Sequence, residues 1–101
     1  MADVLRFHIL VSSDLRAAIN WYDGISERLG NQFRACVDSR FDEIEEHPER
    51  FAVNFDDVRV ARVKRFPYLV LFRLRQEFTQ VLGVFHAASD PRKWRQRSQD
   101  A

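Results

Sequence analysis

The second half of this chain contains one group of basic residues and a single histidine that could together take part in a reaction or bind a phosphate. The group comprises Arg59, Arg62, Lys64, Arg65, Arg73, Arg75, His86, Arg92, Lys93, Arg95 and Arg97. Metal-free cleavage of RNA needs an acid and a base for proton transfer, and cations for the charged transition state. His86 could be the acid or base, because histidine side chains change charge near neutral pH, and Arg73 and Arg92 could hold a phosphate. A histidine at a strand end is more often structural, so both interpretations stay open.

Other kinds of chemistry find little support in the sequence. The three histidines are far apart, and none has the i,i+4 or cysteine spacing that zinc sites use. The three glycines are too scattered to form a phosphate-binding loop. Cys36 falls on the apolar stripe of a predicted helix, which favours a small apolar role over a reactive thiol. We therefore expect no metal, no cofactor and no small-molecule substrate.

The charge of the chain is divided between its two parts, although the formal net charge is only +1. Residues 1–57 carry six Arg against twelve Asp and Glu, a difference of −6. Residues 58–101 carry ten Lys and Arg against three acidic residues, a difference of +7. The protein is therefore not a general polycation, but its basic part could meet phosphates or an acidic partner.

Length and residue usage predict one domain, residues 1–101, in the cytoplasm. A chain of 101 residues suits a single domain. One cysteine excludes an internal disulfide and suits a reducing compartment. No apolar run approaches the roughly 18 residues that span a bilayer, and the first residues do not resemble a signal peptide. We expect no membrane contact.

A strand and two helices are expected in the first half of the chain, before the basic group. Residues 4–11 alternate in polarity, which predicts a strand that buries Leu5, Phe7, Ile9 and Val11. Residues 12–14 are predicted to cap a first helix, which residues 23–24 would break or fray. Ser26 is predicted to cap a second helix, which ends around Glu46 because Pro48 disfavours helical geometry at the residue before it.

Three strands and a short helix are expected to follow, after a connection at 49–57. Along 68–75, four apolar side chains alternate with a second set that ends in Arg73 and Arg75, and 79–86 alternates in the same way. The second face of these strands is predicted to be an open, basic-edged surface. Asp90 and Pro91 predict the start of a terminal basic helix. The expected fold is α+β: a helical hairpin packed on one face of a small, mainly antiparallel four-stranded sheet, in the order β-α-α-β-β-β-α.

Five segments match those of a known family in their order and spacing. They are the early strand with its helix start at 14–15, WYDGISERLGNQF at 21–33, EEHPERF at 45–51, RFPYLVLFR at 65–73 and FHAASDPRKWRQR at 85–97. On these segments the chain resembles the RelE/ParE superfamily of type II toxins, often labelled plasmid stabilisation proteins. The resemblance implies a helical hairpin on a small antiparallel sheet, and a toxin that a cognate antitoxin neutralises.

The resemblance also implies one of two targets, since the superfamily divides. RelE-like members cleave messenger RNA in the ribosomal A site, whereas ParE-like members bind and poison DNA gyrase. Leu69 occupies the position where the RelE-like branch generally carries an Arg, Ser89 or Asp90 lies where a second catalytic Arg is usual, and Trp94 replaces a terminal Tyr. A nuclease would lose roughly 3 kcal/mol or more for each missing cation. The ParE-like, non-enzymatic branch is therefore favoured, with no catalytic residues.

The residues expected to bind the target share a basic or aromatic side chain in the second half of the chain. They are Arg59, Arg62, Arg65, Arg92, Lys93, Trp94, Arg95 and Arg97. Trp94 could stack on a base or anchor its helix to the domain. One alternative is a ribosome-dependent endoribonuclease that uses His86, Arg73 and Arg92, with the ribosome and mRNA as partners. Another is an orphan or degenerate member that is not toxic.

Overall fold

The computed structural model describes residues 4–100 as three α-helices and a five-stranded sheet. The elements in chain order are β1 (Val4–Phe7), α1 (Val11–Ile25), α2 (Glu27–Glu46), a 3-10 turn (Pro48–Arg50), β2 (Val53–Phe55), β3 (Val58–Arg62), β4 (Tyr68–Leu74), β5 (Phe78–His86) and α3 (Pro91–Gln99). The strand order is β1-β5-β4-β3-β2, with β1 parallel to β5 and the other neighbours antiparallel. The α+β class is confirmed. The predicted strand count of four is wrong, because β2 lies in the expected connection at 49–57.

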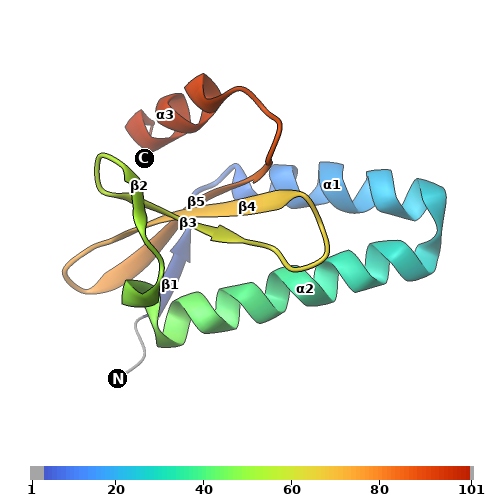
Figure 1. Cartoon of the computed structure of the whole chain (residues 1–101), viewed down its shortest axis with the longest axis horizontal. Coiled ribbons are helices and arrows are strands. Elements are labelled where there is room, and N and C mark those ends of the chain that lie inside the picture. Colours follow the sequence, from blue (N-terminus) through green and yellow to red (C-terminus); the bar gives the residue numbers. More distant parts are fainter. Residues whose placement is uncertain (1–3, 101) are drawn as a thin grey trace.

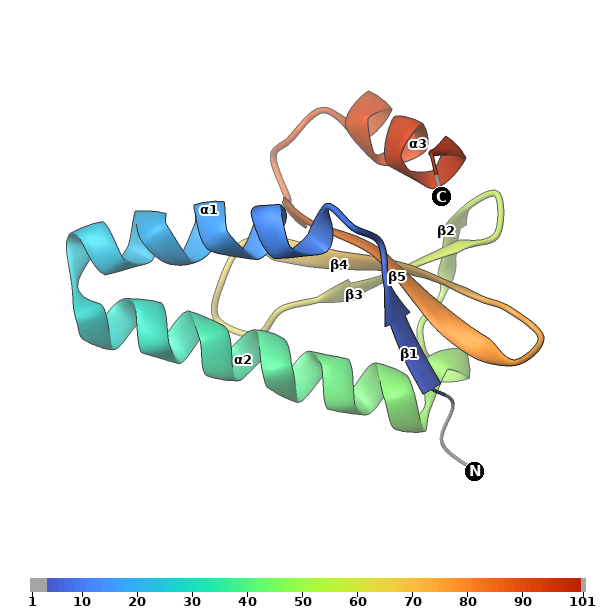
Figure 2. The ribbon, with the colours of Figure 1, turned by 180° about the vertical axis from the view of Figure 1, so that it is seen from behind.

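The helices lie on both faces of the sheet. Figures 1 and 2 show α1 and α2 as an antiparallel hairpin whose turn projects beyond the strands, and α3 on the side of the sheet away from α2. The prediction of an open second face is therefore wrong, because α3 covers part of it. No helix among residues 4–100 is both long and apolar enough to cross a bilayer.

The first strand is shorter than predicted, and α1 begins earlier. β1 ends at Phe7, and a turn follows in which the carbonyl of His8 accepts the N–H of Val11 at 3.0 Å. The imidazole Nδ1 of His8 accepts the N–H of Leu10 at 3.1 Å, and Leu10 is the N-cap residue. The predicted cap at residues 12–14 is therefore wrong, because these residues lie in the first turn of α1 and the Asp14 carboxylate is bonded elsewhere.

The helical hairpin turns at Ser26. The dipeptide at 23–24 does not break α1, which continues to Ile25. The hydroxyl of Ser26 accepts the N–H of Leu29 at 3.0 Å, so the predicted cap of α2 is confirmed. The predicted end of α2 at Glu46 is also confirmed.

The main core lies between the hairpin and the sheet. Tyr22 of α1 and Phe33 of α2 pack on Phe66 and Tyr68, with ring centroids 4.9 to 6.1 Å apart. Phe33 is the fully buried member of this cluster. Burial raises the pKa of both tyrosine hydroxyls, and Tyr22 adds to the increase at Tyr68. Because Phe33 is fully buried, truncating it to Ala should lower the free energy of unfolding by roughly 3–5 kcal/mol.

A β-bulge in β5 changes which side chains share a face. Leu71 pairs with Gly83 and Phe72 pairs with Val81, so Leu82 has no partner on β4. The simple alternation predicted for 79–86 is therefore wrong beyond Leu82. Val81 and Val84 both pack into the main core, whereas Leu82 and Phe85 belong to the cluster under α3.

The predicted start of α3 is confirmed. The Asp90 carboxylate accepts the N–H of Arg92 at 2.9 Å, and Pro91 occupies the first helical position. A second, smaller cluster forms beneath this helix from Val58, Leu69, Leu71, Leu82 and Trp94. Leu69 was expected on an exposed face but is 8% exposed, because the cluster under α3 covers it.

Candidate partner-binding surfaces

Trp94 and Arg97 fasten α3 to the sheet. The indole of Trp94 is 8% exposed in the cluster under α3, and its Nε1 donates to the Ser89 hydroxyl at 3.0 Å. Trp94 therefore anchors α3 to the domain, which is one of the two roles considered for it above. In this conformation its ring is not available for stacking on a base.

Arg97 is neutralised by an acidic residue from the other end of the chain. Its Nη1 and Nη2 donate to the Asp14 carboxylate at 2.7 and 3.0 Å, and the two side chains are 12% and 13% exposed. Asp14 also accepts the N–H of Val84 at 3.0 Å, and Arg97 also donates to the carbonyl of Leu82 at 3.1 Å. The pair therefore joins α1, α3 and β5, and these contacts engage the charge of Arg97 within the fold.

Arg73, the candidate phosphate ligand, lies beneath α3. Its side chain is 9% exposed, and Nη1 donates to the carbonyl of Ser98 at 3.1 Å. Nε lies 3.3 Å from a carboxylate oxygen of Asp57, an ion pair that lacks hydrogen-bond geometry. A phosphate could reach this guanidinium only if α3 moved.

The three residues of the alternative nuclease site do not come together. His86 lies at the exposed end of β5, where its Nδ1 accepts the N–H of Ala88 at 3.0 Å and its ring contacts Tyr68 on the helix-hairpin side. Arg73 pairs in register with Gln80, six residues earlier on β5, which corresponds to roughly 20 Å. Since Arg73 bonds to α3, the two residues also lie on opposite faces of the sheet.

The cations that α3 exposes are Arg92, Lys93 and Arg95. Arg92 is 89% exposed and pairs with Asp90 at 2.7 Å. The hydrogen bond from the Arg92 side chain lowers the pKa of Asp90, and the same bond raises the pKa of Arg92. The Arg95 guanidinium lies 5.1 Å from the centre of the Phe55 ring. These three residues are the part of the predicted target-binding set that α3 presents to a partner.

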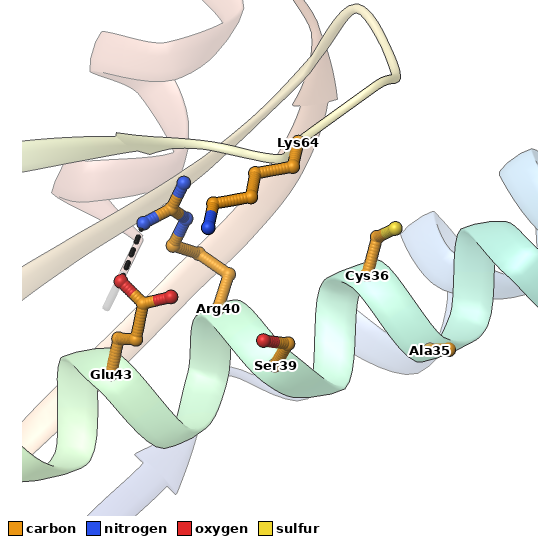
Figure 3. A pocket seen from close by; sticks show the side chains of 6 residues that line it. All are labelled: Ala35, Cys36, Ser39, Arg40, Glu43 and Lys64. Carbon is orange, nitrogen blue, oxygen red and sulfur yellow. Dashed lines mark hydrogen bonds and ion pairs between the residues drawn. The ribbon is translucent and has the colours of Figure 1, made fainter.

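A groove between α2 and the connection from β3 to β4 contains the next group of cations. It has a volume of about 570 Å³ and is lined by Arg40, Arg62, Val63, Lys64, Arg65, Phe66 and Pro67. Figure 3 shows the Arg40 and Lys64 side chains together where α2 faces this connection. Arg40 Nη1 donates to Glu43 at 2.7 Å, and its Nε donates to the carbonyl of Arg62 at 2.6 Å.

Only some of the residues that line this groove were predicted from the sequence to bind a partner. Arg62 and Arg65 belonged to the predicted target-binding set, and Lys64 to the wider basic group. Arg40 was missed because it lies in the acidic part of the chain. Arg59 is separate from the groove residues and donates to the carbonyl of Phe51 at 2.7 Å. The dense basic run at 62–65 was the signal that could have identified the groove.

An apolar groove lies at the β1 edge of the sheet. It measures about 390 Å³ and is lined by Phe7, His8, Ile9, Val11, Ser12, Leu15, Asp38 and Phe41. Phe7 and Ile9 are 50% and 85% exposed, so the prediction that they lie on a buried strand face is wrong. The turn after Phe7 ends the strand and brings this apolar segment to the surface, beside the unpaired edge of β1.

Within residues 4–100, no three His, Cys, Asp or Glu side chains gather closely enough to hold a metal ion. The arrangement offers apolar and cationic surface to another macromolecule. It does not bring His86 and Arg73, the base and the phosphate ligand of the nuclease alternative, to one point.

The chain is similar to known proteins in its sequence and in its fold. Residues 5–91 match the family described as "ParE toxin of type II toxin-antitoxin system, parDE". The chain is 30% identical over 88 residues to "Toxin ParE2" of Mycobacterium tuberculosis, in both strain CDC 1551 / Oshkosh and strain H37Rv, and the match covers 86% of this chain and 84% of the relative. The solved structure "Chromosomal ParDE TA system from P. aeruginosa" superposes with a TM-score of 0.75 at 17% identity, over 84% of this chain and 96% of that one.

Proposed function

The chain belongs to the ParE toxin family, the toxins of type II toxin–antitoxin systems, and from that membership we propose that a cognate antitoxin holds it inactive. When free, it binds and poisons DNA gyrase by protein–protein contact, without catalysis of its own. The observation that carries the non-enzymatic part is the separation of His86 from Arg73, at opposite ends and on opposite faces of the β4–β5 pair. General acid–base chemistry needs such groups within hydrogen-bond reach of one reacting centre.

The apolar groove at β1 is the proposed contact for the antitoxin. Val4, Phe7 and Ile9 are all half or more exposed, and no strand among residues 4–100 pairs with the outer edge of β1. An extended segment can add to such an edge through main-chain hydrogen bonds and place apolar side chains in the groove beside it. The exposed cations of α3 are the proposed contact for the target, with Arg92, Lys93 and Arg95 as anchors.

Expression of the toxin in cells, with and without the adjacent antitoxin gene, tests this proposal. Toxin alone should produce filamentous cells and a DNA-damage response, and co-expression should restore growth. An abrupt halt in translation, with new transcript ends inside codons, would instead identify a ribosome-dependent endoribonuclease. Normal growth with well-expressed, folded toxin would identify a non-toxic member.

Substitution of His86 separates binding from catalysis more sharply. His86→Ala should leave both toxicity and antitoxin binding unchanged, because Arg73, the cation expected to act with the imidazole in RNA cleavage, lies at the other end of the β4–β5 pair and on the other face of the sheet. Growth inhibition by the variant and by wild type is compared at matched expression. Loss of toxicity with intact antitoxin binding would contradict the non-enzymatic proposal.

A further inference from the structure

Two adjoining hollows lie between α2 and the β3–β4 connection, and they share Arg40 and Lys64. The larger is the basic groove described above. The smaller, of about 140 Å³, is also lined by Ala35, Cys36, Ser39 and Glu43. Figure 3 shows these residues along α2, with Lys64 reaching toward the helix from the connection. The two hollows are together called the recess, and none of the residues that line them belongs to α3 or β1.

The larger hollow carries unneutralised positive charge. Arg62, Lys64 and Arg65 are exposed, and none of them forms an ion pair with any residue between 4 and 100. Arg40 is paired with Glu43 and also bonded to the backbone of Arg62, so it holds α2 to the end of β3. Three free cations within four residues favour an acidic ligand, both in the encounter and in the bound complex.

The smaller hollow distinguishes between acidic ligands. Its walls are the small side chains of Ala35, Cys36 and Ser39, the stems of Arg40 and Lys64, and Glu43, whose carboxylate is paired with Arg40. A cavity of roughly 150 Å³ holds one benzene molecule, so the hollow suits one apolar side chain. None of its lining residues is aromatic, and Phe66, which lines the larger hollow, is only 9% exposed, so the recess offers little surface for the base stacking that single-stranded nucleic acids use. An acidic polypeptide therefore fits better than a nucleic acid.

We propose that this recess binds an acidic segment of a partner protein. One aliphatic side chain of the segment occupies the small hollow, and its carboxylates contact Arg62, Lys64 and Arg65. The inference rests on the proposed function, under which the segment belongs to the antitoxin. The antitoxin then holds the toxin at two separate places, the β1 groove and this recess.

Cys36 provides a direct test, because it is the only cysteine of the chain and it lines the small hollow. The rate of alkylation of its thiol by iodoacetamide is measured for free toxin and for the purified toxin–antitoxin complex. Binding in the recess should slow alkylation by about tenfold or more, since an occupied site reacts only when it is vacated. The same measurement is repeated with a DNA duplex in place of the antitoxin, and no protection is expected.

Two variants with matched controls locate the contact. The triple substitution Arg62→Gln, Lys64→Gln and Arg65→Gln should weaken antitoxin binding by about tenfold at low salt. Its matched control is the triple substitution Arg16→Gln, Arg28→Gln and Arg34→Gln, which removes equal charge from exposed helix positions outside the recess. Ser39→Trp should fill the small hollow and weaken binding. Asn31→Trp, on an exposed part of the same helix, should not. Thermal unfolding confirms that each variant is folded.

The outcomes separate this inference from the function on which it rests. An antitoxin that binds tightly while Cys36 reacts at the free rate, or while both recess variants bind as their controls do, overturns the inference alone. Protection of Cys36 by the DNA duplex and not by the antitoxin overturns it in favour of a nucleic-acid site. An antitoxin that does not bind the wild-type toxin overturns the proposed function and this inference with it.

Discussion

Among single residues, Asp14 and Arg97 form a largely buried ion pair that attaches α3 to α1 and β5. The Asp14 carboxylate accepts three hydrogen bonds, two from Arg97 and one from the backbone of Val84. Both side chains are largely buried. Removing one partner therefore leaves a charge that is shielded from water and has no counter-charge.

Asp14→Ala should destabilise the protein by about 3 kcal/mol, because Arg97 would remain partly buried without its carboxylate. Urea denaturation gives the free energy of unfolding. In the double variant Asp14→Ala with Arg97→Met, a large part of that loss should be recovered, since the unpaired charge is gone. A double variant that is less stable than the single one would contradict this account of the pair.

Gly83 is required by the same contact. A β-carbon at this position would lie 2.8 Å from Nη1 of Arg97 and 2.5 Å from the Phe85 ring. Gly83→Ala should therefore cost roughly 1–3 kcal/mol and increase hydrogen exchange in α3 more than in α2. Gly24→Ala is the control, because a β-carbon there meets no atom within 4 Å. Equal exchange in α3 for wild type and Gly83→Ala would count against this role.

The sequence could not reveal these residue roles, because they depend on distant partners. Asp14 follows two serines, and such a run ordinarily indicates a helix cap. Its actual partner lies 83 positions away in α3, and no local pattern encodes such a pairing. Arg97 and Trp94 were assigned to target binding for the same reason. Their residue types indicate recognition, whereas their burial is a property of the folded chain.

At the scale of elements, the attachment of α3 should depend on pH through its cap, Asp90. Hydrogen bonds from Arg92 hold the pKa of Asp90 below its ordinary value of 3.8. A lowered folded-state pKa means that the capping contribution is fully present above 3.8 and is lost as the pH falls through the lowered value. α3 should therefore loosen in acid.

Trp94 fluorescence measures this loosening when Trp21→Phe removes the other, exposed indole. Emission should shift to longer wavelength below about pH 4 as Trp94 leaves its cluster. With Asp90→Asn added, the side chain still caps α3 but does not titrate. The acid transition should then be smaller. An identical transition in both proteins would show that another group controls the loosening.

Removing α3 altogether should destabilise the whole domain. Truncation after Ala88 takes away Trp94 and the partner of Asp14, and exposes Leu69, Leu71 and Leu82. We expect a loss of several kcal/mol, from roughly 25 cal/mol for each Å² of apolar surface exposed and from the unpaired carboxylate. Circular dichroism during heating gives the change in Tm. An unchanged Tm would show that α3 contributes little to the fold.

The elements that the sequence predicted best are those with a long periodic pattern. α2 was placed correctly at both ends because Ser26 caps it and Pro48 follows its end. β2 was missed because it has only three residues and a register shift against β3, too short for an alternation to be visible. The second face of the sheet was predicted to be open because the sequence shows the alternation of its side chains. The sequence does not show that α3 packs over them.

In the whole molecule, the basic residues of the second half of the chain do not form one surface. Some of the basic residues are engaged within the fold, such as Arg73 and Arg97. The cations left for partners are mainly those of α3 and of the recess beside α2. Family membership was predictable from five ordered segments. The sequence did not predict which basic residues remain available to a partner, because that depends on the packing of α3 and of the β3–β4 connection.

Under the proposed function, the free toxin acts on gyrase by binding and not by cutting RNA. Purified toxin is added to DNA gyrase with relaxed plasmid, and supercoiling and cleaved DNA are measured with and without the antitoxin. Wild type and His86→Ala are expected to inhibit supercoiling alike, and the antitoxin should reverse the effect. Inhibition should be weaker when Arg92, Lys93 and Arg95 are changed to Gln. Undisturbed supercoiling, together with cleavage of mRNA on ribosomes by wild type but not by His86→Ala, would overturn the proposed function.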